Sequence, residues 1–286
     1  MEAYSVLMSV YSKVDPQHFR EAVQSMMEQS VLTNDFVLVC DGPLTVEQEQ
    51  VLEDFCEKYP GLFHVVRLPE NLGIGPAAAA GLEKCKNDLV AKMDSDDIAV
   101  HNRCQLQLEL FEKDPELIVA GGVIEEFDKD PNKPFAIRAV PETNEEIRRF
   151  ARRRQPFNNV SVMYRRSAVL AVGGYRHYRR CEDYDMYVRL LHAGYKAGNL
   201  SQVLVKVRVN NGALSRRSSW PSAAGCIRSR WYAFRIGYSS LWDFLYCAIG
   251  QLVVCISPVW LQQYIYRKMF REKCNTDVER ESMQSK

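Results

Sequence analysis

The sequence predicts an α/β fold in which a mostly parallel sheet is flanked by helices. Short, continuous apolar runs alternate with amphipathic stretches over the first hundred residues, and the links between them are short. Runs of this kind are typical of parallel strands that are covered on both faces. With 286 residues, 47% hydrophobic and 26% charged, the chain can form one large domain with an appendage.

The first half of the chain supplies three strands, three helices and a fourth, central strand. Asp15 followed by Pro16 predicts the start of a helix that runs to about Gln29, because Pro suits the first helical position. Thr45 is expected to cap a second helix that ends near Tyr59. The expected strands are 4–10, 36–40, 64–68 and 89–94, and residues 71–87 should form a glycine-rich turn that feeds an alanine-rich helix.

The second half continues with shorter elements and ends in two helical stretches. Gly194 is expected to end the helix that follows a second acidic cluster. The expected elements are a helix at 101–111, a strand at 117–124, a hairpin or loop at 127–141, a basic helix at 145–154, a strand at 160–164, a short helix at 167–172, a helix at 184–193, a strand at 203–209, a polar loop at 210–219 and a basic helix at 223–236.

A carboxylate cluster follows the central strand directly. Asp94, Ser95, Asp96 and Asp97 come straight after the apolar run. Carboxylates at i and i+2 can reach one ion, and Mg²⁺ commonly takes one or two carboxylates together with substrate phosphates. Because Asp and Ser are also preferred N-caps, the cluster could instead cap a helix that begins near Val100.

Two further strand ends carry polar side chains, at Ser9 to Tyr11 and at Asp41. Ligands of parallel α/β sheets lie at the carboxyl ends of the strands. Three such ends together favour a binding site over a simple cap. Asp41 stands before Gly42 and Pro43, so it also suits an ordinary turn.

Charge is unevenly distributed, although the net charge is only +1. Residues 1–142 hold 12 Lys/Arg and 26 Asp/Glu, whereas residues 143–286 hold 25 and 10. The basic half suits phosphates or an anionic membrane. No nucleic-acid partner is expected, because zinc-ligand spacing, a basic zipper and an aromatic RNA-binding pattern are all missing from the sequence.

The cysteines and the N-terminal residues favour a cytoplasmic location. Nine Cys without C-x-x-C pairs indicate a reducing compartment and no disulfide framework. The first residues lack the basic and apolar regions of a signal peptide.

The apolar stretch 241–261 is interrupted by Asp243, Gln251 and Pro258. A spanning helix needs about 20 apolar residues, so we expect an interfacial or re-entrant helix pair, peripherally associated with the inner membrane. Packing against the main domain is the alternative. The expected division is a main domain at 1–220, with a nucleotide-donor half at 1–100 and an acceptor half at 101–220, and a membrane-associating helical region at 221–286.

Taken together, these motifs resemble those of the inverting family-2 glycosyltransferases with the GT-A fold, whose mixed, mostly parallel sheet is Rossmann-like. Each motif alone is weak, but their order and spacing are specific. The resemblance covers roughly residues 4–217 and is strongest to bacterial enzymes of exopolysaccharide, capsule or O-antigen assembly, such as the amylovoran biosynthesis glycosyltransferases. The matching segments are 9–11, 41–42, 71–75, 92–97, 161–165, 182–185 and 208–217.

The resemblance implies roles for the residues at the strand ends. Asp96 would bind Mn²⁺ or Mg²⁺ that bridges the nucleotide diphosphate, and Asp94 would share the metal and lie nearer the ribose. Asp97 would only cap the following helix, and Asp41 would bind the base. The other donor-binding residues implied are Ser9, Tyr11, Asn71, Gly73, Lys92, Ser95, Arg216 and Arg217.

Alternatives stay open for the basic residues. Lys92 would contact phosphate or be a solvated Lys at a strand end. Arg208, Arg216 and Arg217, with Ser215, would close over the donor diphosphate as a lid or form a solvated basic loop. The basic run 148–154 would meet a lipid diphosphate or form a solvated helix face. The family often has a His near Asn210, where this chain has Asn, so the third metal ligand stays open.

The second acidic cluster, Glu182, Asp183 and Asp185, opens an expected helix. Inversion needs a base opposite the leaving group, and the resemblance implies Asp183 as that base with Glu182 as a supporting carboxylate. N-capping is the other interpretation of Asp183. Asp185 is expected to pair with Arg189 one helical turn later.

The expected function is therefore inverting, metal-assisted transfer of a hexose from a nucleotide-diphosphate donor, expected to be a UDP-sugar. The acceptor would be a saccharide on polyprenyl diphosphate at the cytoplasmic membrane face. A sugar-1-phosphate nucleotidyltransferase would need a Gly-rich basic loop after the first strand, where residues 11–16 carry none. A non-catalytic polysaccharide-assembly scaffold would not need two intact acidic clusters.

Overall fold

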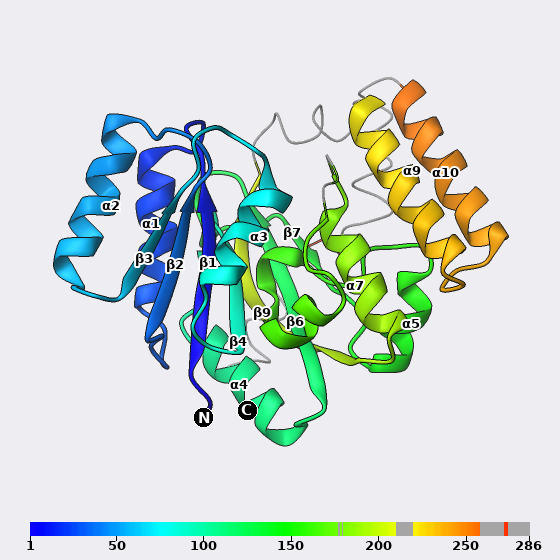
Figure 1. The fold of residues 1–286 in the computed structure, drawn as a ribbon, viewed down its shortest axis with the longest axis horizontal. Helices are drawn as coiled ribbons and strands as arrows, with labels where there is room; N and C mark the ends of the chain where they lie inside the picture. Colours follow the sequence, from blue (N-terminus) through cyan, green and yellow to red (C-terminus); the bar gives the residue numbers. More distant parts are fainter. Residues whose placement is uncertain (177, 179, 210–219, 258–271, 274–286) are drawn as a thin grey trace.

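The computed structural model describes residues 1–176, 178, 180–209, 220–257 and 272–273. Its first half alternates strand and helix as expected, and this order builds the central part of the sheet (Figure 1). The elements are β1 (Tyr4–Val10), α1 (Pro16–Met27), β2 (Asp35–Cys40), α2 (Val46–Lys58), β3 (Phe63–Arg67), α3 (Ile74–Lys84) and β4 (Leu89–Asp94).

The second half inserts antiparallel strands and adds a helical end. The elements are β5 (Ile98–Ala99), α4 (Arg103–Lys113), β6 (Leu117–Phe127), β7 (Ala136–Arg138), α5 (Asn144–Ala151), the 3-10 helix η1 (Asn159–Ser161), β8 (Met163–Arg165), α6 (Arg166–Ala171), α7 (Glu182–His192), β9 (Lys196–Arg208), α9 (Trp220–Arg235), α10 (Leu241–Ile256) and β10 (Glu272–Lys273).

The strands form one mixed sheet in the order β10-β7-β6-β8-β4-β1-β2-β3, with β9 beside β6 and β5. β1 runs parallel to β2 and β4, and β2 runs parallel to β3. β8 is antiparallel to both β4 and β6. In this register Ser9 lies opposite Asp94, so the carboxyl ends of β1 and β4 meet at one edge. The predicted α/β class is confirmed.

Alternate residues of the strands face two separate helical layers. Tyr4, Val6 and Met8 of β1 pack in the core shared with α1, α2 and α4. Leu7 packs on the other face, in the core shared with α3, α5 and α7. This period of two is what a strand covered on both faces requires. The sheet is therefore held between helices on both sides.

The predicted helix starts of the first half are confirmed. The Asp15 carboxylate accepts hydrogen bonds from the N–H groups of Gln17 and His18, and Pro16 is the first helical residue. Thr45 and Gln48 form a reciprocal capping box at α2. Local capping chemistry fixes these two helices.

Helix α3 packs closely on the sheet because its facing residues are small. Ala77 and Ala78 are buried. A Cβ atom at Gly81 would lie 2.4 Å from Leu7 Cδ1 and 2.6 Å from Val39 Cγ2, so glycine is required for this approach. The small side chains bring the N-terminus of α3 down to the edge of the sheet.

Three predicted boundaries of the second half were wrong. Helix α4 begins at Arg103 rather than His101, because the short strand β5 intervenes and pairs with β9. The segment expected as a strand at 160–164 is divided between η1 and β8. β9 begins at Lys196 and runs parallel to β6 through register shifts, whereas the prediction placed a strand at 203–209.

The two C-terminal helices lie side by side next to α7 and α5 (Figure 1). Ala233 of α9 packs against Tyr184 and Val188 of α7, so the helical end is attached to the main domain. A disulfide between Cys181 and Cys226 joins the start of α7 to α9, which corrects the expectation that no cysteines pair. No helix in the described part of the chain combines the length and apolarity that crossing a bilayer requires.

Candidate active site

The end of β4 presents a buried lysine and an accessible carboxylate. Lys92 is 4% exposed, and its Nζ donates to Asp94 Oδ1 at 2.5 Å. The Asp94 side chain is 44% exposed. Below them the fully buried Arg103 donates to the carbonyl oxygen of Lys92 at 2.6 Å and so holds the strand end. The interpretation of Lys92 as a solvated strand-end residue is therefore wrong.

Asp96 and Asp97 form the rest of the first acidic cluster. Burial and then the charge of Asp94 raise the pKa of Asp96. Burial and then the charges of Asp96 and Asp94 raise the pKa of Asp97 well above its usual range. The prediction that Asp97 caps the following helix is wrong. Its Oδ1 instead accepts a hydrogen bond, at 2.8 Å, from the backbone N–H of Arg208 in β9.

The Arg208 side chain is buried and has fixed partners within the protein. Its side chain is 6% exposed and forms an ion pair with Glu21 of α1 at 2.7 Å. Its Nε donates to the carbonyl oxygen of Asp96 at 3.3 Å, and its guanidinium lies over the ring of Phe127. The prediction that Arg208 belongs to a closing lid is therefore wrong. Ser215, Arg216 and Arg217, together with Asn210 and Asn211, lie outside the described residues.

Asp41 organises the turn that precedes α3. Its two carboxylate oxygens accept the N–H groups of Leu72 at 2.7 Å and of Gly73 at 3.1 Å. Asn71 Nδ2 donates to the carbonyl oxygen of Asp41 at 3.2 Å. Gly73 has a φ of +92°, which favours glycine at this position. The predicted residues Asp41, Asn71 and Gly73 are thus brought together.

The remaining predicted donor residues lie at the same sheet edge. Ser9 is half-buried and opposite Asp94, and Ser95 is buried. The carbonyl oxygen of Tyr11 accepts a hydrogen bond from Gln48 Nε2 at 3.0 Å, which fixes the chain leaving β1.

The second acidic cluster occupies the first turn of α7. Glu182 and Asp183 are inside the helix, and the N-cap is Cys181, at a φ of +65°. The interpretation of Asp183 as an N-cap is therefore wrong. Carboxylates in the first turn are stabilised by the helix dipole. Asp183 is half-buried, with Gln155 Nε2 at 2.7 Å from its Oδ2.

Glu182 is buried between α7 and the start of α3. A Cβ at Gly75 would lie 3.2 Å from Glu182 Cγ, so the absence of a side chain there makes room for Glu182. Burial and then the charge of Asp183 raise the pKa of Glu182 to about 7, against the smaller effects of Lys92 and Arg180. Burial therefore keeps Glu182 protonated to a higher pH than a free glutamate.

Tyr187 lies on the helix that carries the second acidic cluster. This fully buried residue of α7 donates from its hydroxyl to Asn159 Oδ1 at 2.8 Å. Burial, and then the charges of Asp183, Tyr164, Asp94 and Glu182, raise the pKa of Tyr187 well above its usual range. On the same helix Glu182 lies against Gly75 at the start of α3, and the turn before α3 is bonded to Asp41, so the second cluster lies beside the sheet edge.

The raised pKa of Glu182 predicts a pH-dependent stability. From its ordinary value of 4.5 up to about 7, the unfolded chain ionises at this site while the native protein stays protonated. Native stability is therefore lost as the pH rises through this window. In metal-free protein, Glu182→Gln should raise Tm by about 3–8 °C at pH 8 and by about 0–2 °C at pH 4.5.

Thermal unfolding across this pH range checks that prediction. Glu116→Gln, at a side chain that is 84% exposed, is the matched control and should give a small, nearly constant difference. A Glu182→Gln difference in Tm that does not change with pH would contradict the assignment.

Other charged residues of the second half have structural partners. Arg189 forms the predicted buried ion pair with Asp185 at 2.8 Å and also donates to the carbonyl oxygens of Val172 and Gly174. In the basic run, Arg148 donates to the carbonyl oxygen of Leu191 at 2.6 Å and so satisfies the end of α7. For Arg148, the interpretation of residues 148–154 as a solvated or lipid-facing helix face is therefore wrong.

The carboxylates of Asp94 and Asp96 fit a divalent cation in charge and donor type. Their mutual repulsion contributes to the raised pKa of Asp96, and a cation between them would relieve it. Among the described residues, no group of three or more His, Cys, Asp and Glu side chains is arranged to hold a metal ion. A cation here would take its remaining oxygens from a diphosphate and water, as Mg²⁺ commonly does.

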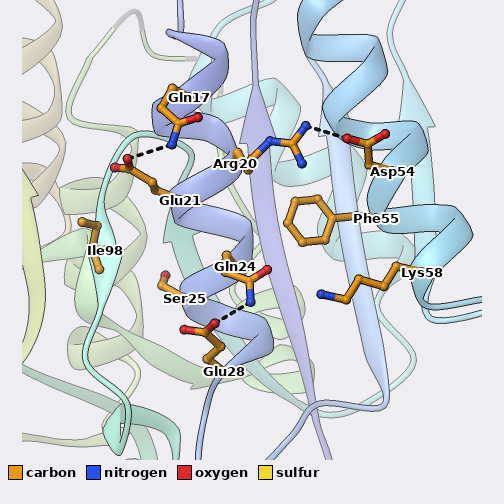
Figure 2. Close-up of a pocket in the computed structure, with 10 residues that line it drawn as sticks. All are labelled: Gln17, Arg20, Glu21, Gln24, Ser25, Glu28, Asp54, Phe55, Lys58 and Ile98. Carbon is orange, nitrogen blue, oxygen red and sulfur yellow. Dashed lines mark hydrogen bonds and ion pairs between the residues drawn. The ribbon is translucent and has the colours of Figure 1, made fainter.

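A hollow of about 400 Å³ on the outer face of α1 is separate from this site. Figure 2 shows three pairs within its polar lining, Arg20 with Asp54, Gln17 with Glu21 and Gln24 with Glu28. None of the predicted site residues lines it. The hollow therefore gives no reason to move the site from the sheet edge.

Four residues that contact or support the site were not predicted from the sequence. Gly75, Arg103, Gln155 and Tyr187 act through contacts with residues far away in the chain. Only Gly75 lies in a segment that had been singled out. The others have no local signature, because an Arg in a helix or a Gln before a Pro is ordinary in any sequence.

Sequence comparisons place the chain among sugar-transferring enzymes. The profile described as Glycosyl transferase family 2 matches residues 5–179. An uncharacterized glycosyltransferase of Haemophilus influenzae is 37% identical over 94% of this chain and 99% of its own length. An amylovoran biosynthesis glycosyltransferase of Erwinia amylovora is 32% identical, over 93% and 98%. A UDP-Gal:α-D-GlcNAc-diphosphoundecaprenol β-1,3-galactosyltransferase of Escherichia coli is 31% identical, over 94% and 96%.

Solved structures share the fold at low sequence identity. TarS of S. aureus, residues 1–349 in complex with UDP-GlcNAc, has a TM-score of 0.67 at 16% identity and covers 88% of this chain and 72% of its own. A mannosyltransferase of Pyrobaculum calidifontis in complex with GDP-Man and Mn²⁺ has a TM-score of 0.64 at 14% identity, over 92% and 78%. The fold is therefore that of the GT-A glycosyltransferases.

Proposed function

The chain belongs to glycosyl transferase family 2, and from this premise we propose that it transfers a hexose, with inversion, from a UDP-sugar to a saccharide carried on polyprenyl diphosphate. It is a glycosyltransferase of bacterial polysaccharide biosynthesis. The observation that supports the finer proposal is that Glu182 of the second acidic cluster lies against Gly75, beside the sheet edge that carries the first cluster, because the reaction needs one cluster for the diphosphate and another for the acceptor.

The donor side of the proposal rests on the edge formed by β1, β2 and β4. Asp41, with the turn at Asn71 to Gly73, would bind the nucleobase and ribose, and Asp94 and Asp96 would hold Mn²⁺ or Mg²⁺. A divalent ion bound there would offset the negative charge that develops on the leaving diphosphate. Lys92 is a buried cation at the same edge and would add to that effect once donor phosphate competes for it.

The acceptor side rests on the first turn of α7. Asp183 is half-buried and accepts one hydrogen bond on each oxygen, and in the proposal it faces the incoming hydroxyl. In the proposed step this hydroxyl oxygen bonds to the anomeric carbon, the bond to the UDP oxygen breaks on the opposite face, and Asp183 takes the hydroxyl proton. Glu182, partly protonated near neutral pH, would limit the negative charge beside the base.

The E. coli relative supports the choice of donor and acceptor. Its name specifies UDP-Gal as donor and a GlcNAc-diphosphoundecaprenol acceptor, and the two chains match over almost their whole lengths. The structures bound to UDP-GlcNAc and to GDP-Man with Mn²⁺ support a nucleotide-sugar and a divalent ion at this fold. We therefore propose that the protein works at the cytoplasmic face of the membrane, where such an acceptor would be presented.

A panel of UDP- and GDP-sugars tests the proposal. Release of UDP or GDP would be measured with GlcNAc-diphosphoundecaprenol as acceptor, with and without Mn²⁺. We expect UDP release from one donor that depends on both the acceptor and the divalent ion. Absence of acceptor-dependent release from every donor would reject the proposed reaction.

The membrane contact would be made by the outward face of α10. Trp242, Tyr246, Ile249, Val253 and Ile256 are between 50% and 77% exposed and recur at helical spacing along one stripe. The charged residue of this helix, Asp243, is buried and faces the domain instead. An exposed apolar stripe with interfacial aromatics suits insertion at the level of lipid headgroups.

Vesicle binding checks this surface. Trp242→Glu and Ile249→Glu should each lower the affinity for phosphatidylethanolamine–phosphatidylglycerol vesicles by about ten-fold or more, because a charge replaces inserted apolar area. Leu32→Glu, at a loop side chain that is 63% exposed, is the matched control. Unchanged co-sedimentation of both α10 variants would show that this face does not insert.

A further inference from the structure

Gln155 contacts the proposed base from a different part of the chain. It lies between α5 and η1, directly before Pro156, where the backbone favours an extended conformation. Its Nε2 donates to Asp183 Oδ2 at 2.7 Å. The other oxygen, Oδ1, accepts the N–H of Tyr184 at 2.7 Å. Asp183 is thus held by one bond from its own helix and one from outside it.

The chemistry of the carboxylate fixes which way the Gln155 amide points. An ionised carboxylate only accepts hydrogen bonds, so the NH₂ group must face it. With the amide turned this way, Gln155 Oε1 is buried and has no hydrogen-bond partner among the described residues. A buried unsatisfied carbonyl is costly, so the bond to Asp183 outweighs that cost in setting the orientation.

The segment that carries Gln155 is anchored to the C-terminal helical region. Arg153, two residues earlier, forms an ion pair with the buried Asp243 of α10 and lies over the ring of Tyr246. Cys247 donates from its Sγ to the carbonyl oxygen of Arg153 at 3.2 Å. Residues 153–155 therefore connect α10 at one end to Asp183 at the other.

We propose that Gln155 is a positioning residue for the base Asp183, and that the Arg153–Asp243 ion pair keeps it in place. This inference rests on the proposed function, in which Asp183 takes the acceptor proton. Gln155 fixes the plane of the carboxylate so that a lone pair of Asp183 stays directed at the acceptor hydroxyl. A misplacement of about 1 Å at a reacting group costs about 10²-fold in rate.

The test compares Gln155→Leu and Gln155→Glu with wild type in steady-state UDP release. We expect kcat to fall about 10- to 100-fold in Gln155→Leu, with the donor KM within about two-fold of wild type. In Gln155→Glu the added carboxylate repels Asp183, so kcat should fall at least as far. Gln50→Leu is the matched control, because Gln50 donates a similar bond to the exposed Asp54 far from the site.

Asp243→Asn tests whether the Arg153–Asp243 ion pair keeps Gln155 in place. Loss of the charge that holds Arg153 should lower kcat, with the donor KM within about two-fold of wild type, but less than Gln155→Leu does. An unchanged kcat in Asp243→Asn would overturn the anchoring part of the proposal. If Gln155→Leu does not fold, the nearly isosteric Gln155→Glu decides the positioning part alone.

Asp183→Asn measured in parallel separates this inference from the proposed function. If Asp183→Asn is inactive while Gln155→Leu keeps wild-type kcat, the positioning role is wrong and the base assignment stands. If Asp183→Asn retains wild-type turnover, the base assignment itself fails. A loss in Gln155→Leu that raises only the donor KM would also reject a role through Asp183.

Discussion

Asp96→Ala is expected to abolish sugar transfer, with kcat/KM reduced by about 10³-fold or more. The side chain would hold the cation and, through it, the donor diphosphate. The change should not unfold the protein, because the contact from Arg208 goes to the carbonyl oxygen of Asp96 and not to the carboxylate. Removing the charge also relieves the repulsion that raises the pKa of Asp96, so Tm should stay equal or increase.

Calorimetry of UDP binding in the presence of Mn²⁺ shows whether the loss of activity in Asp96→Ala arises from a loss of donor binding. We expect Asp96→Ala to lose binding, and Asp130→Ala, at a carboxylate of the β6–β7 hairpin, to bind and turn over as wild type does. Wild-type affinity for UDP and Mn²⁺ in Asp96→Ala would show that the cation is held elsewhere.

Asp183→Asn is expected to keep donor binding and lose turnover, with kcat lower by about 10²- to 10⁴-fold. The amide has nearly the shape of the carboxylate but cannot accept the proton of the acceptor hydroxyl. The donor KM and the affinity for UDP with Mn²⁺ should stay within about two-fold of wild type, because the proposal places the diphosphate at β4 and not at α7. Steady-state kinetics and calorimetry together check the separation of binding from turnover.

Asp185→Asn gives the contrast within the same helix turn. Asp185 is buried and paired with Arg189, so its loss should cost stability, about 3–5 kcal/mol, rather than a catalytic group. If Asp183→Asn lowered Tm as strongly as Asp185→Asn and kept its kcat, Asp183 would be a structural residue.

The parts of the fold set by neighbouring residues were predictable from the sequence. The Asp15–Pro16 and Thr45–Gln48 helix starts depend on residues within one turn, and both are confirmed. The strands of the parallel half are short apolar runs, and their period and length suffice to place them. Because ligands of parallel α/β sheets lie at the carboxyl ends of the strands, Ser9 and Asp94 were expected at one edge of the sheet. The strand register puts them opposite each other.

The errors arise where a distant partner decides the role of a residue. Asp97 has the sequence signature of a helix cap, yet its carboxylate accepts a hydrogen bond from Arg208, which is 111 residues away. Arg208 in turn has the signature of a mobile basic loop but is packed against Glu21 and Phe127. Short-range sequence patterns contain no information on such partners, because β5 and β9 come together only when the sheet has folded.

Gln155 shows the same limit for the candidate site. Its importance depends on where α7 is placed relative to the segment after α5, and no spacing rule connects residues 155 and 183. The disulfide between Cys181 and Cys226 is a similar case, since scattered cysteines give no pairing signal. Side chains that support a site from other elements are the part that needs coordinates.

The central claim is that the cation and the base share one region of the protein, near Tyr187. Protein labelled with 3-fluorotyrosine tests this by ¹⁹F NMR, with the Tyr187 signal identified by its loss in Tyr187→Phe. On addition of Mn²⁺ and UDP, we expect the Tyr187 signal to broaden strongly, the signal of Tyr59 at the end of α2 to stay sharp, and Asp96→Ala to prevent the broadening. A Tyr187 signal that stays sharp while calorimetry shows Mn²⁺ and UDP bound would contradict the claim.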